Sequence, residues 1–283
     1  MDPDPEAVLP ASQILKTAFI SVVFSTCNYF TSEKTLSFFP SKKNLPKPDT
    51  VAKVQPVIKK KKKRTIYLTF DDGPNRGTRK VMHIAVDEKV PISMFMVGEH
   101  VYGTPYQKAT LDSVLAIDMI EVCNHSWCHA NNHYNRYYNN ADSVVDDFER
   151  CKDSLHLTNN IARTPGRNIW RTENINSTDI KKSIDAADSL QQKGYDLIGW
   201  DLEWHFDNKL HLQNCADSLL KQIDSVFKKG KTKNNDHLVL LAHDQVYEDP
   251  DDSSQLKRLM NQLKTNDEYN IEFISTYPGI KKN

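Results

Sequence analysis

The chain has 283 residues with 37 basic and 37 acidic side chains, so its formal net charge is zero. Hydrophobic residues make up 39% and charged residues 26%, which is typical of a soluble globular protein of one or two domains. The balanced charge gives no reason to expect nucleic acid or an acidic membrane as the main partner. The five cysteines form no CxxC pair, which argues against a zinc ribbon and a disulfide framework.

Residues 1–27 have features of an export signal. Residues 17–26 form one apolar run after Lys16, which is too short to span a membrane and fits the hydrophobic region of a secretory signal. Two small hydroxyl residues precede Cys27, which is similar to a bacterial lipoprotein cleavage site, although the stretch before the run is acidic. We therefore expect export to the periplasm or cell envelope, with membrane attachment through a lipidated Cys27. The alternative is a loosely packed N-terminal helix.

Residues 28–63 are expected to form a flexible linker. They carry several prolines and scattered lysines without a regular period, and the basic run KKKKKR follows at 59–64. A basic run can mark an anionic-ligand patch. This one stands alone without interleaved aromatic residues, so we interpret it as a solvated lead into the first strand. The main folded domain is expected at residues 64–283.

From Thr65 onward, short apolar runs alternate with helical patterns, which is typical of a parallel sheet covered by helices. Strands are expected at 65–70, 92–98, 118–126, 195–204, 237–243 and 271–276. Helices are expected at 76–89, 104–116, 141–156, 178–193, 211–229 and 252–265. A domain of about 220 residues with this alternation suits a single α/β barrel.

Reactive side chains recur just past the last apolar residue of several expected strands. Asp71 and Asp72 end the first strand in TIYLTFDDGP, and His125, Arg163 and His243 follow later apolar segments. The carboxyl ends of parallel barrel strands share one face, and catalytic residues gather there. The sequence therefore predicts that these five side chains form one site.

The segment HSWCH places His125 and His129 four residues apart. On a helical turn, side chains with this spacing lie on one face, so two imidazoles can bind one metal ion. The pair alone is weak evidence, because similar pairs occur on helix surfaces without a ligand. The adjacent aspartates strengthen it, since one carboxylate can be a third ligand and the cation offsets their repulsion. Successive strand residues point in opposite directions, so the other carboxylate can face the substrate.

The motifs TFDDGP, HSWCH, RTPG, a Trp-rich acidic segment and LLAH occur in this order. Together they resemble the NodB-type polysaccharide deacetylases (carbohydrate esterase family four), from roughly Arg64 to the C-terminus. The resemblance implies an α/β fold, a distorted (β/α) barrel of about seven parallel strands. It also implies metal-dependent hydrolysis of N-acetyl or O-acetyl groups on an acetylated glycan.

The resemblance assigns roles position by position. Asp71 would be the general base, and Asp72, His125 and His129 would bind the metal, which is expected to be Zn²⁺ or another divalent ion such as Co²⁺ or Ni²⁺. A divalent ion lowers the pKa of bound water towards about 7. Three protein ligands leave open positions for water and substrate.

The resemblance further implies that His243 is the general acid and that Arg163 holds Asp71 through a charge-assisted hydrogen bond. The acidic residue that orients His243 is less clear, because the segment GWDLEWHFDNK departs from the family pattern. Asp207 lies nearest the expected place, and Asp201 and Glu203 are the alternatives.

Substrate contacts are expected from the later motifs. The family usually has an aromatic residue after the proline of the third motif, but Gly166 stands there, so the aromatic wall is lost. The Gly166 N–H can still donate to an oxyanion, and Arg167 can take over some substrate contact. Trp200, Trp204 and Leu241 are candidates for the pocket of the acetyl methyl group. For the two tryptophans, plain core packing is the equal alternative.

Three functions are compatible with these residues. A metal-dependent deacetylase acting on an N-acetylglucosamine-containing cell-envelope glycan accounts for all five motifs. A non-catalytic carbohydrate-binding barrel that retains the metal site would tolerate loss of Asp71 or His243, yet both are present. A phosphoester hydrolase would favour more carboxylates and a second metal. The tyrosines at 133–140 either stack on sugar rings or cover the barrel mouth, and the oligomeric state stays open.

Overall fold

The computed structural model describes residues 63–281, so the expected signal segment, Cys27 and the linker up to residue 62 lie outside the described residues. The strands are β1 (Arg64–Gly73), β2 (Ile92–Met96), β3 (Ile120–Asn124), β4 (Ile161–Ala162), β5 (Ile169–Arg171), β6 (Asn176–Thr178), β7 (Asp196–Leu197), β8 (Leu202–Glu203), β9 (His237–His243) and β10 (Tyr269–Ile271). The α-helices are α1 (Thr78–Glu88), α2 (Gly98–Val101), α3 (Pro105–Leu115), α4 (Tyr134–Tyr137), α5 (Ala141–Leu155), α6 (Ile184–Gln192), α7 (Ala216–Lys228) and α8 (Pro250–Thr265). Short 3-10 helices are η1 (His129–Asn132), η2 (Lys181–Ser183), η3 (Asp244–Glu248) and η4 (Ile274–Thr276).

All of these strands belong to one curled sheet with the order β6-β5-β7-β4-β3-β2-β1-β9-β8, and β10 pairs with β1. The pairs are parallel except those of β5 with β6 and with β7. Within residues 63–281 the two edge strands, β6 and β8, do not pair with each other, so the sheet is a half-barrel. The expected α/β barrel class is confirmed. The antiparallel β5–β6 hairpin is an addition that the alternating pattern did not predict.

The alternation of side chains along β1 explains why both faces of the sheet are apolar. Ile66, Leu68 and Phe70 pack in the core cluster shared with α1 and α8. Tyr67, on the opposite face, packs inside the curl in a cluster with Phe95, Cys123, Ile161, Trp170, Ile198, Val239, Ile274 and Tyr277. A third cluster lies under α5 and α6. The inner face of β1 therefore leads directly to the carboxylates at its end.

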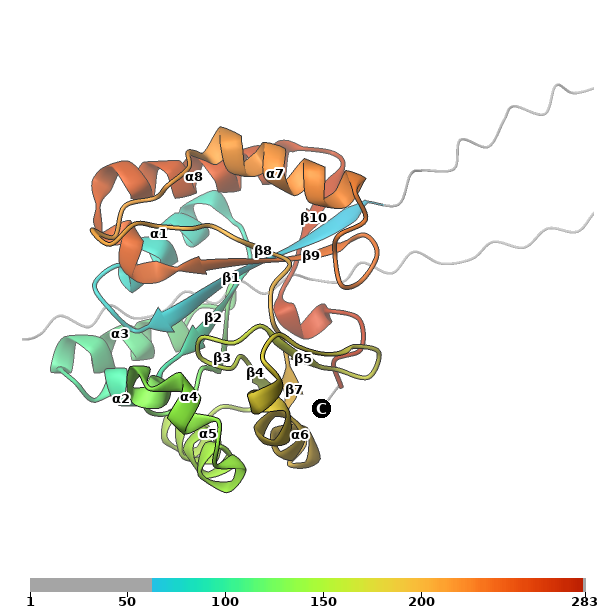
Figure 1. Cartoon of the computed structure of the whole chain (residues 1–283). Helices are drawn as coiled ribbons and strands as arrows, with labels where there is room; N and C mark the ends of the chain where they lie inside the picture. The colour runs from blue at the N-terminus through green and yellow to red at the C-terminus, as the bar shows by residue number, and fades with distance from the viewer. Residues whose placement is uncertain (1–62, 282–283) are drawn as a thin grey trace, which may run out of the picture. The chain divides into compact units, whose positions relative to one another are not determined.

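The helices fall into two groups around the sheet. Figure 1 shows α1, α7 and α8 beside β1 and β9, and α2 to α6 beside the strands from β2 to β7. The N-termini of α3, α5 and α8 are capped by side chains, as at α5, where Asn140 accepts a hydrogen bond from the N–H of Ser143. Within residues 63–281, no helix is both long and apolar enough to cross a membrane.

Two expected strands are wrong. Of the expected strand at 271–276, only Ile271 lies in a strand (β10), and residues 274–276 form η4. Residues 195–204 were expected to be continuous, but the structure has β7 and β8 separated by an irregular stretch. Gly199 explains the break, because its backbone passes so close to Asn168 and Trp170 that an added Cβ would lie 2.0 Å and 2.4 Å from their side chains. The Asn168 side chain bonds both the N–H and the carbonyl of Trp200. The chain therefore leaves the sheet here, which moves the tryptophan segment relative to a regular strand.

Candidate active site

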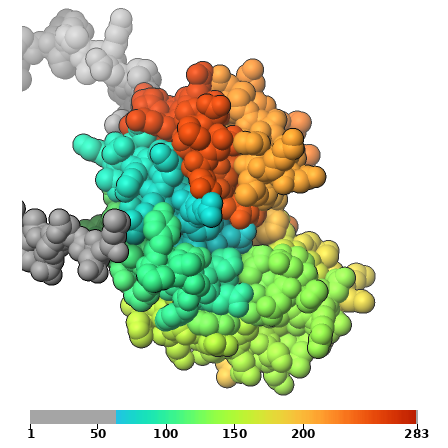
Figure 2. Space-filling view, turned by 90° about the vertical axis from the view of Figure 1, so that its left-hand side faces the viewer, coloured from blue at the N-terminus to red at the C-terminus, as the bar shows by residue number. Residues whose placement is uncertain are grey.

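The two aspartates lie at the carboxyl end of β1, in the middle of the sheet. The pairing of β1 with β2 shifts between Asp71 and Gly73, and Asp72 has a φ of 73°. Asp72 is therefore out of the ladder, and the expected opposite orientation of neighbouring strand residues does not hold. Both carboxylates approach His125 Nε2, at 3.6 Å for Asp71 Oδ2 and 3.4 Å for Asp72 Oδ1. In Figure 2, the blue part of the chain that includes this strand end lies between the red and green segments.

The two histidines converge on Asp72 from a loop after β3. His125 Nδ1 lies 2.9 Å from the carbonyl oxygen of Arg163, so this nitrogen carries the proton and donates it. The Nε2 lone pair is left facing Asp72. His129 Nε2 lies 3.1 Å from the same Asp72 Oδ1, and the two imidazole centroids are 5.2 Å apart. A backbone acceptor on the far nitrogen is a common way to fix the tautomer of a metal-binding histidine.

The expected helical turn between His125 and His129 is wrong. Ser126 has a φ of 69° and His129 a φ of 48°, which are left-handed values, so the segment is an irregular loop. Asp147 on α5 holds this loop, because its Oδ2 accepts hydrogen bonds from the N–H groups of Trp127 (3.0 Å) and Cys128 (3.4 Å). Sequence reasoning missed Asp147, which sits beside the buried face of α5 and carries no motif.

Asp72, His125 and His129 fit a divalent metal ion. Their ligand atoms lie within 4.8 Å of one another. Asp72 Oδ1 is buried and has no hydrogen-bond partner among the described residues, although His129 Nε2 lies only 3.1 Å away. Burial alone would raise the pKa of Asp72, but imidazoles that are protonated when no cation is bound hold that pKa well below its usual range. Acceptors that converge in this way are stabilised by a cation between them.

A second cluster, His211 with Asp249 and Asp252, is accounted for without an ion. Asp249 caps α8 by accepting hydrogen bonds from the N–H groups of Asp251 and Asp252. Asp252 Oδ2 lies 3.2 Å from His211 Nδ1. Helix capping explains Asp249, and the contacts with His211 and with the Leu212 N–H explain Asp252.

Arg163 is fully buried and fixes Asp71. Its Nη1 donates to Asp71 Oδ1 at 2.8 Å and to Thr69 Oγ1 at 2.9 Å. Its Nε donates to the carbonyl of Ile198 and its Nη2 to the carbonyl of Gly199, each at 3.0 Å. The predicted contact with Asp71 is present, and it occupies Oδ1, so Oδ2 is the carboxylate oxygen that faces the site.

His243 ends β9 directly beside Asp71 in the strand register. Its ring packs edge-on against Phe206, with centroids 5.1 Å apart. Its Nδ1 is buried without a hydrogen-bond partner among the described residues. Asp207, which was expected to orient it, instead accepts hydrogen bonds from the N–H groups of Lys209 (2.8 Å) and His211 (3.0 Å). Among the described residues, Asp207 therefore makes no hydrogen bond to His243 that could orient its ring.

The two alternative acids also have other partners. The Asp201 carboxylate accepts hydrogen bonds from the N–H groups of Lys233 and Val239, and burial raises its pKa to about 6. Glu203 Oε1 lies 3.4 Å from His205 Nδ1. Each of these carboxylates therefore stabilises its own part of the fold.

Asp244 is a site neighbour that sequence reasoning missed, although it directly follows His243. It is buried, and its carboxyl group accepts hydrogen bonds from Asn75 Nδ2 and Thr78 Oγ1 in the segment after Asp72. Burial, together with the charges of the β1 carboxylates, raises its pKa to about 7. Asp244 thus ties the end of β9 to the turn that follows β1.

The predicted substrate residues lie in different environments. Gly166 is exposed with a φ of 61°, and its N–H has no partner among the described residues. Trp200 is half-buried, and Leu241 is 3% exposed on the same strand as His243. Trp204 is 1% exposed in the main core cluster, and its indole N–H donates to the carbonyl of Asn214. For Trp204 the packing alternative describes the structure.

Comparison with known proteins identifies the motif-bearing part of the chain. Residues 58–169 match the family model for polysaccharide deacetylase. This span contains the aspartate, histidine and arginine motifs. The resemblance to the polysaccharide deacetylases is confirmed.

The individual proteins that the chain is similar to are distant from it in sequence. The chitin disaccharide deacetylase of Vibrio alginolyticus is 22% identical over 271 residues, which cover 66% of this chain and 64% of that protein. A family 4 carbohydrate esterase from Streptomyces lividans, solved with acetate, is 17% identical with a TM-score of 0.55 and covers 76% of this chain and 95% of its own. An esterase of the same family from Streptococcus mutans is 19% identical with a TM-score of 0.56, covering 74% and 86%. The solved structures show that the fold is shared.

Proposed function

We propose that the chain removes acetyl groups from a polysaccharide by metal-dependent hydrolysis. The observation that carries the proposal is the convergence of Asp72, His125 and His129 beside a carboxylate that a buried arginine holds. The match to the polysaccharide deacetylase family model supports the reaction class. Neighbouring side chains at this strand end are 2.8–3.6 Å apart, which is close enough for them to act on one small acyl group.

Asp72, His125 and His129 would hold the ion, which we propose to be Zn²⁺ or another divalent cation such as Co²⁺ or Ni²⁺. When bound, such an ion supplies Lewis acidity towards the acetyl carbonyl and lowers the pKa of water towards about 7. The donor set of one carboxylate oxygen and two imidazole nitrogens suits zinc, which readily accepts nitrogen ligands.

Asp71 is the proposed general base. Its Oδ1 is bonded to Arg163, so Oδ2, which lies on the side of His125, takes the proton from the attacking water. The guanidinium keeps the carboxylate charged and fixes its direction through a charge-assisted hydrogen bond. Burial of both groups excludes competing water from the pair.

His243 is the proposed general acid, and Gly166 the proposed oxyanion donor. His243 lies beside Asp71 in the sheet, so it can deliver a proton to the leaving amine or alcohol. The Gly166 N–H is free among the described residues and can donate to the developing oxyanion. Trp200 and Leu241 remain candidates for the wall around the acetyl methyl group.

The substrate is proposed to be an N-acetylglucosamine-containing glycan of the cell envelope, with N-acetyl favoured over O-acetyl. Relatives named as a chitin disaccharide deacetylase and chitooligosaccharide deacetylases support this sugar. We further propose export through residues 1–27, a linker at 28–63 and a catalytic domain at 64–283. Membrane attachment through a lipidated Cys27 belongs to the same proposal.

The proposal is tested by measuring acetate release from a panel of acetylated glycans, with chelator and after Zn²⁺ is restored. Asp71→Asn should lower kcat by about 10² to 10⁴, because the base is lost, while elemental analysis shows that the metal is retained. Asp87→Asn, an exposed change of the same kind on α1, is the control. If the metal-loaded protein releases no acetate, the chain is instead a carbohydrate-binding barrel. If Asp71→Asn retains full activity, Asp71 is not the general base.

A further inference from the structure

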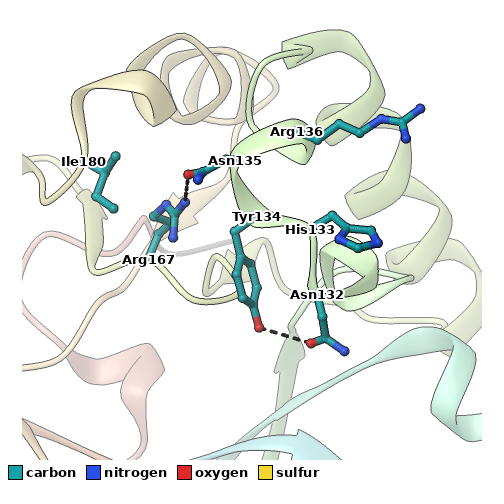
Figure 3. A pocket seen from close by; sticks show the side chains of 7 residues that line it. All are labelled: Asn132, His133, Tyr134, Asn135, Arg136, Arg167 and Ile180. Carbon is teal, nitrogen blue, oxygen red and sulfur yellow. Dashed lines mark hydrogen bonds between the residues drawn. The ribbon is translucent and has the colours of Figure 1, made fainter.

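A cavity of about 550 Å³ adjoins the metal-binding residues. Its lining residues, shown in Figure 3, are Asn132, His133, Tyr134, Asn135, Arg136, Arg167 and Ile180. The Tyr134 ring stands edge-on to the His129 ring, with centroids 5.9 Å apart, so the cavity and the catalytic site share a wall. The volume lies within the range of about 300–1,000 Å³ that small-ligand pockets occupy.

Arg167 is a buried cation without an anionic partner. The residue is only 7% exposed, and within residues 63–281 no carboxylate lies within ion-pair distance of its guanidinium. Buried charges in proteins are usually paired, because removing a charge from water is costly. An unpaired guanidinium in a cavity wall therefore indicates a missing anion.

The present partners of Arg167 are all neutral. Its Nε donates to Ser183 Oγ at 3.3 Å, its Nη1 to the carbonyl of Gly166 at 2.8 Å, and its Nη2 to Asn135 Oδ1 at 3.0 Å. A guanidinium has five N–H groups, so one remains on each of the two terminal nitrogens. A planar carboxylate can engage one N–H group on each terminal nitrogen when it binds arginine with both oxygens.

An aromatic surface lies next to this cation. The Tyr134 ring lies so close over Gly166 that a Cβ added there would be 2.9 Å from it. The Arg167 guanidinium carbon is 5.5 Å from the Tyr134 centroid and 5.3 Å from that of Tyr138. The wall that the third motif lacks is therefore supplied by α4. A sugar ring can pack on such a ring while its substituents reach the guanidinium.

We propose that this cavity is a subsite for a carboxylate-bearing sugar, with Arg167 pairing with the carboxylate and Tyr134 packing against the ring. The inference rests on the proposed function, because it places the acidic sugar beside the sugar unit of the glycan from which the acetyl group is removed. Arg136 does not share this role, since Figure 3 shows its side chain directed away from Arg167. The glycan substrate is thus an acidic one.

The first test needs no variant. Binding of a hyaluronan oligosaccharide, which carries a carboxylate on alternate sugars, is compared by calorimetry with a chitin oligosaccharide of equal length on the Zn²⁺-loaded chain. We expect at least about tenfold tighter binding of the acidic ligand, and loss of the preference for its methyl ester. Equal affinities, or tighter binding of a sulfated chitin oligosaccharide than of the carboxylated one, would overturn the assignment.

Two variants test whether the charge of Arg167 causes the preference for the acidic ligand. Arg167→Gln should lower the preference by about 10- to 100-fold, whereas Lys182→Gln, an exposed neutralisation next to Ser183, should leave it unchanged. An equal loss in both variants would show a diffuse charge effect and contradict the subsite. The methyl-ester comparison stands even if Arg167→Gln folds poorly. A preference for the acidic ligand without acetate release would contradict the proposed function but not the subsite. Acetate release without that preference would contradict the subsite but not the proposed function.

Discussion

The proposed site has a metal side, with Asp72, His125 and the Asp71–Arg163 pair, and an acid side, with His243. The two sides differ in how firmly their side chains are held. On the metal side, Arg163 donates four hydrogen bonds and His125 is fixed through its far nitrogen to a backbone carbonyl. On the acid side, His243 Nδ1 has no partner within residues 63–281, and the nearby acids Asp201 and Asp207 bond backbone N–H groups instead.

The difference follows from what carries each side. The metal-side residues extend from β1, β3 and β4, whose hydrogen bonds fix their ends. The acid side depends on the irregular stretch around residues 198–215, where the sequence departs from the family pattern. Metal ligands must converge within tenths of an ångström. A proton donor needs only one reachable nitrogen, so it tolerates looser support.

The largest expected effect is on the metal side. His125→Ala removes one of the three proposed ligands, so bound metal measured by elemental analysis should fall to background and acetate release should drop by more than about 10⁴. His83→Ala, an exposed histidine on α1, is the matched control and should retain both. Full metal occupancy in His125→Ala would place the ion elsewhere and remove the basis of the comparison.

A smaller loss is expected from a residue that touches neither metal nor substrate. Asp147→Ala removes the acceptor of the Trp127 and Cys128 N–H groups, so the loop that carries His129 should loosen. We expect metal affinity, measured by competition with a chelator, to fall by about 10- to 100-fold. Asp146→Ala, the exposed neighbour, provides the control. Unchanged affinity in Asp147→Ala would mean that the loop holds its shape unaided.

His125 and Asp147 also show how much of the site the sequence could predict. His125 and His129 were identifiable from HSWCH, and their convergence with Asp72 follows from the strand order, but the expected helical turn is a left-handed loop. Asp147 carries no pattern, because its role depends on how α5 packs against a loop 20 residues earlier. The apolar periodicity predicted the main strands and helices, whereas the Gly199 break depends on a contact between distant segments.

Asp244 should give the acid side a pH-dependent stability. Its folded-state pKa of about 7 lies above the ordinary value of 3.8, so the folded state binds this proton more tightly. Its contribution is present below about pH 4 and is lost as the pH rises through about 7. Wild type should therefore lose roughly 1–3 kcal/mol more stability than Asp244→Asn over that range, measured as urea midpoints in chelator. Parallel pH profiles for the two proteins would show that Asp244 is charged throughout, and Asp87→Asn should follow wild type.

The smallest effect is expected from Asp207→Asn, which tests the orientation of His243 predicted from the sequence. Because the carboxylate bonds the turn at Lys209 and His211, kcat should stay within about twofold of wild type. His243→Ala, assayed alongside, should lower kcat by about 10² to 10⁴ and shows that the assay can detect loss of the acid. A tenfold or greater drop in Asp207→Asn would mean that the acid side is held as firmly as the metal side.

The left-handed stretch after HSWCH limits how this site can be transplanted. His129, Ala130, Asn131 and Asn132 have φ values of 48°, 56°, 46° and 58°, and none of them is glycine. Each such residue costs about 1–2 kcal/mol relative to right-handed backbone. An isolated peptide with this sequence would relax to other conformations, so grafting the motif into a foreign scaffold would not reproduce the chelate unless the surrounding helix and strand ends were copied with it.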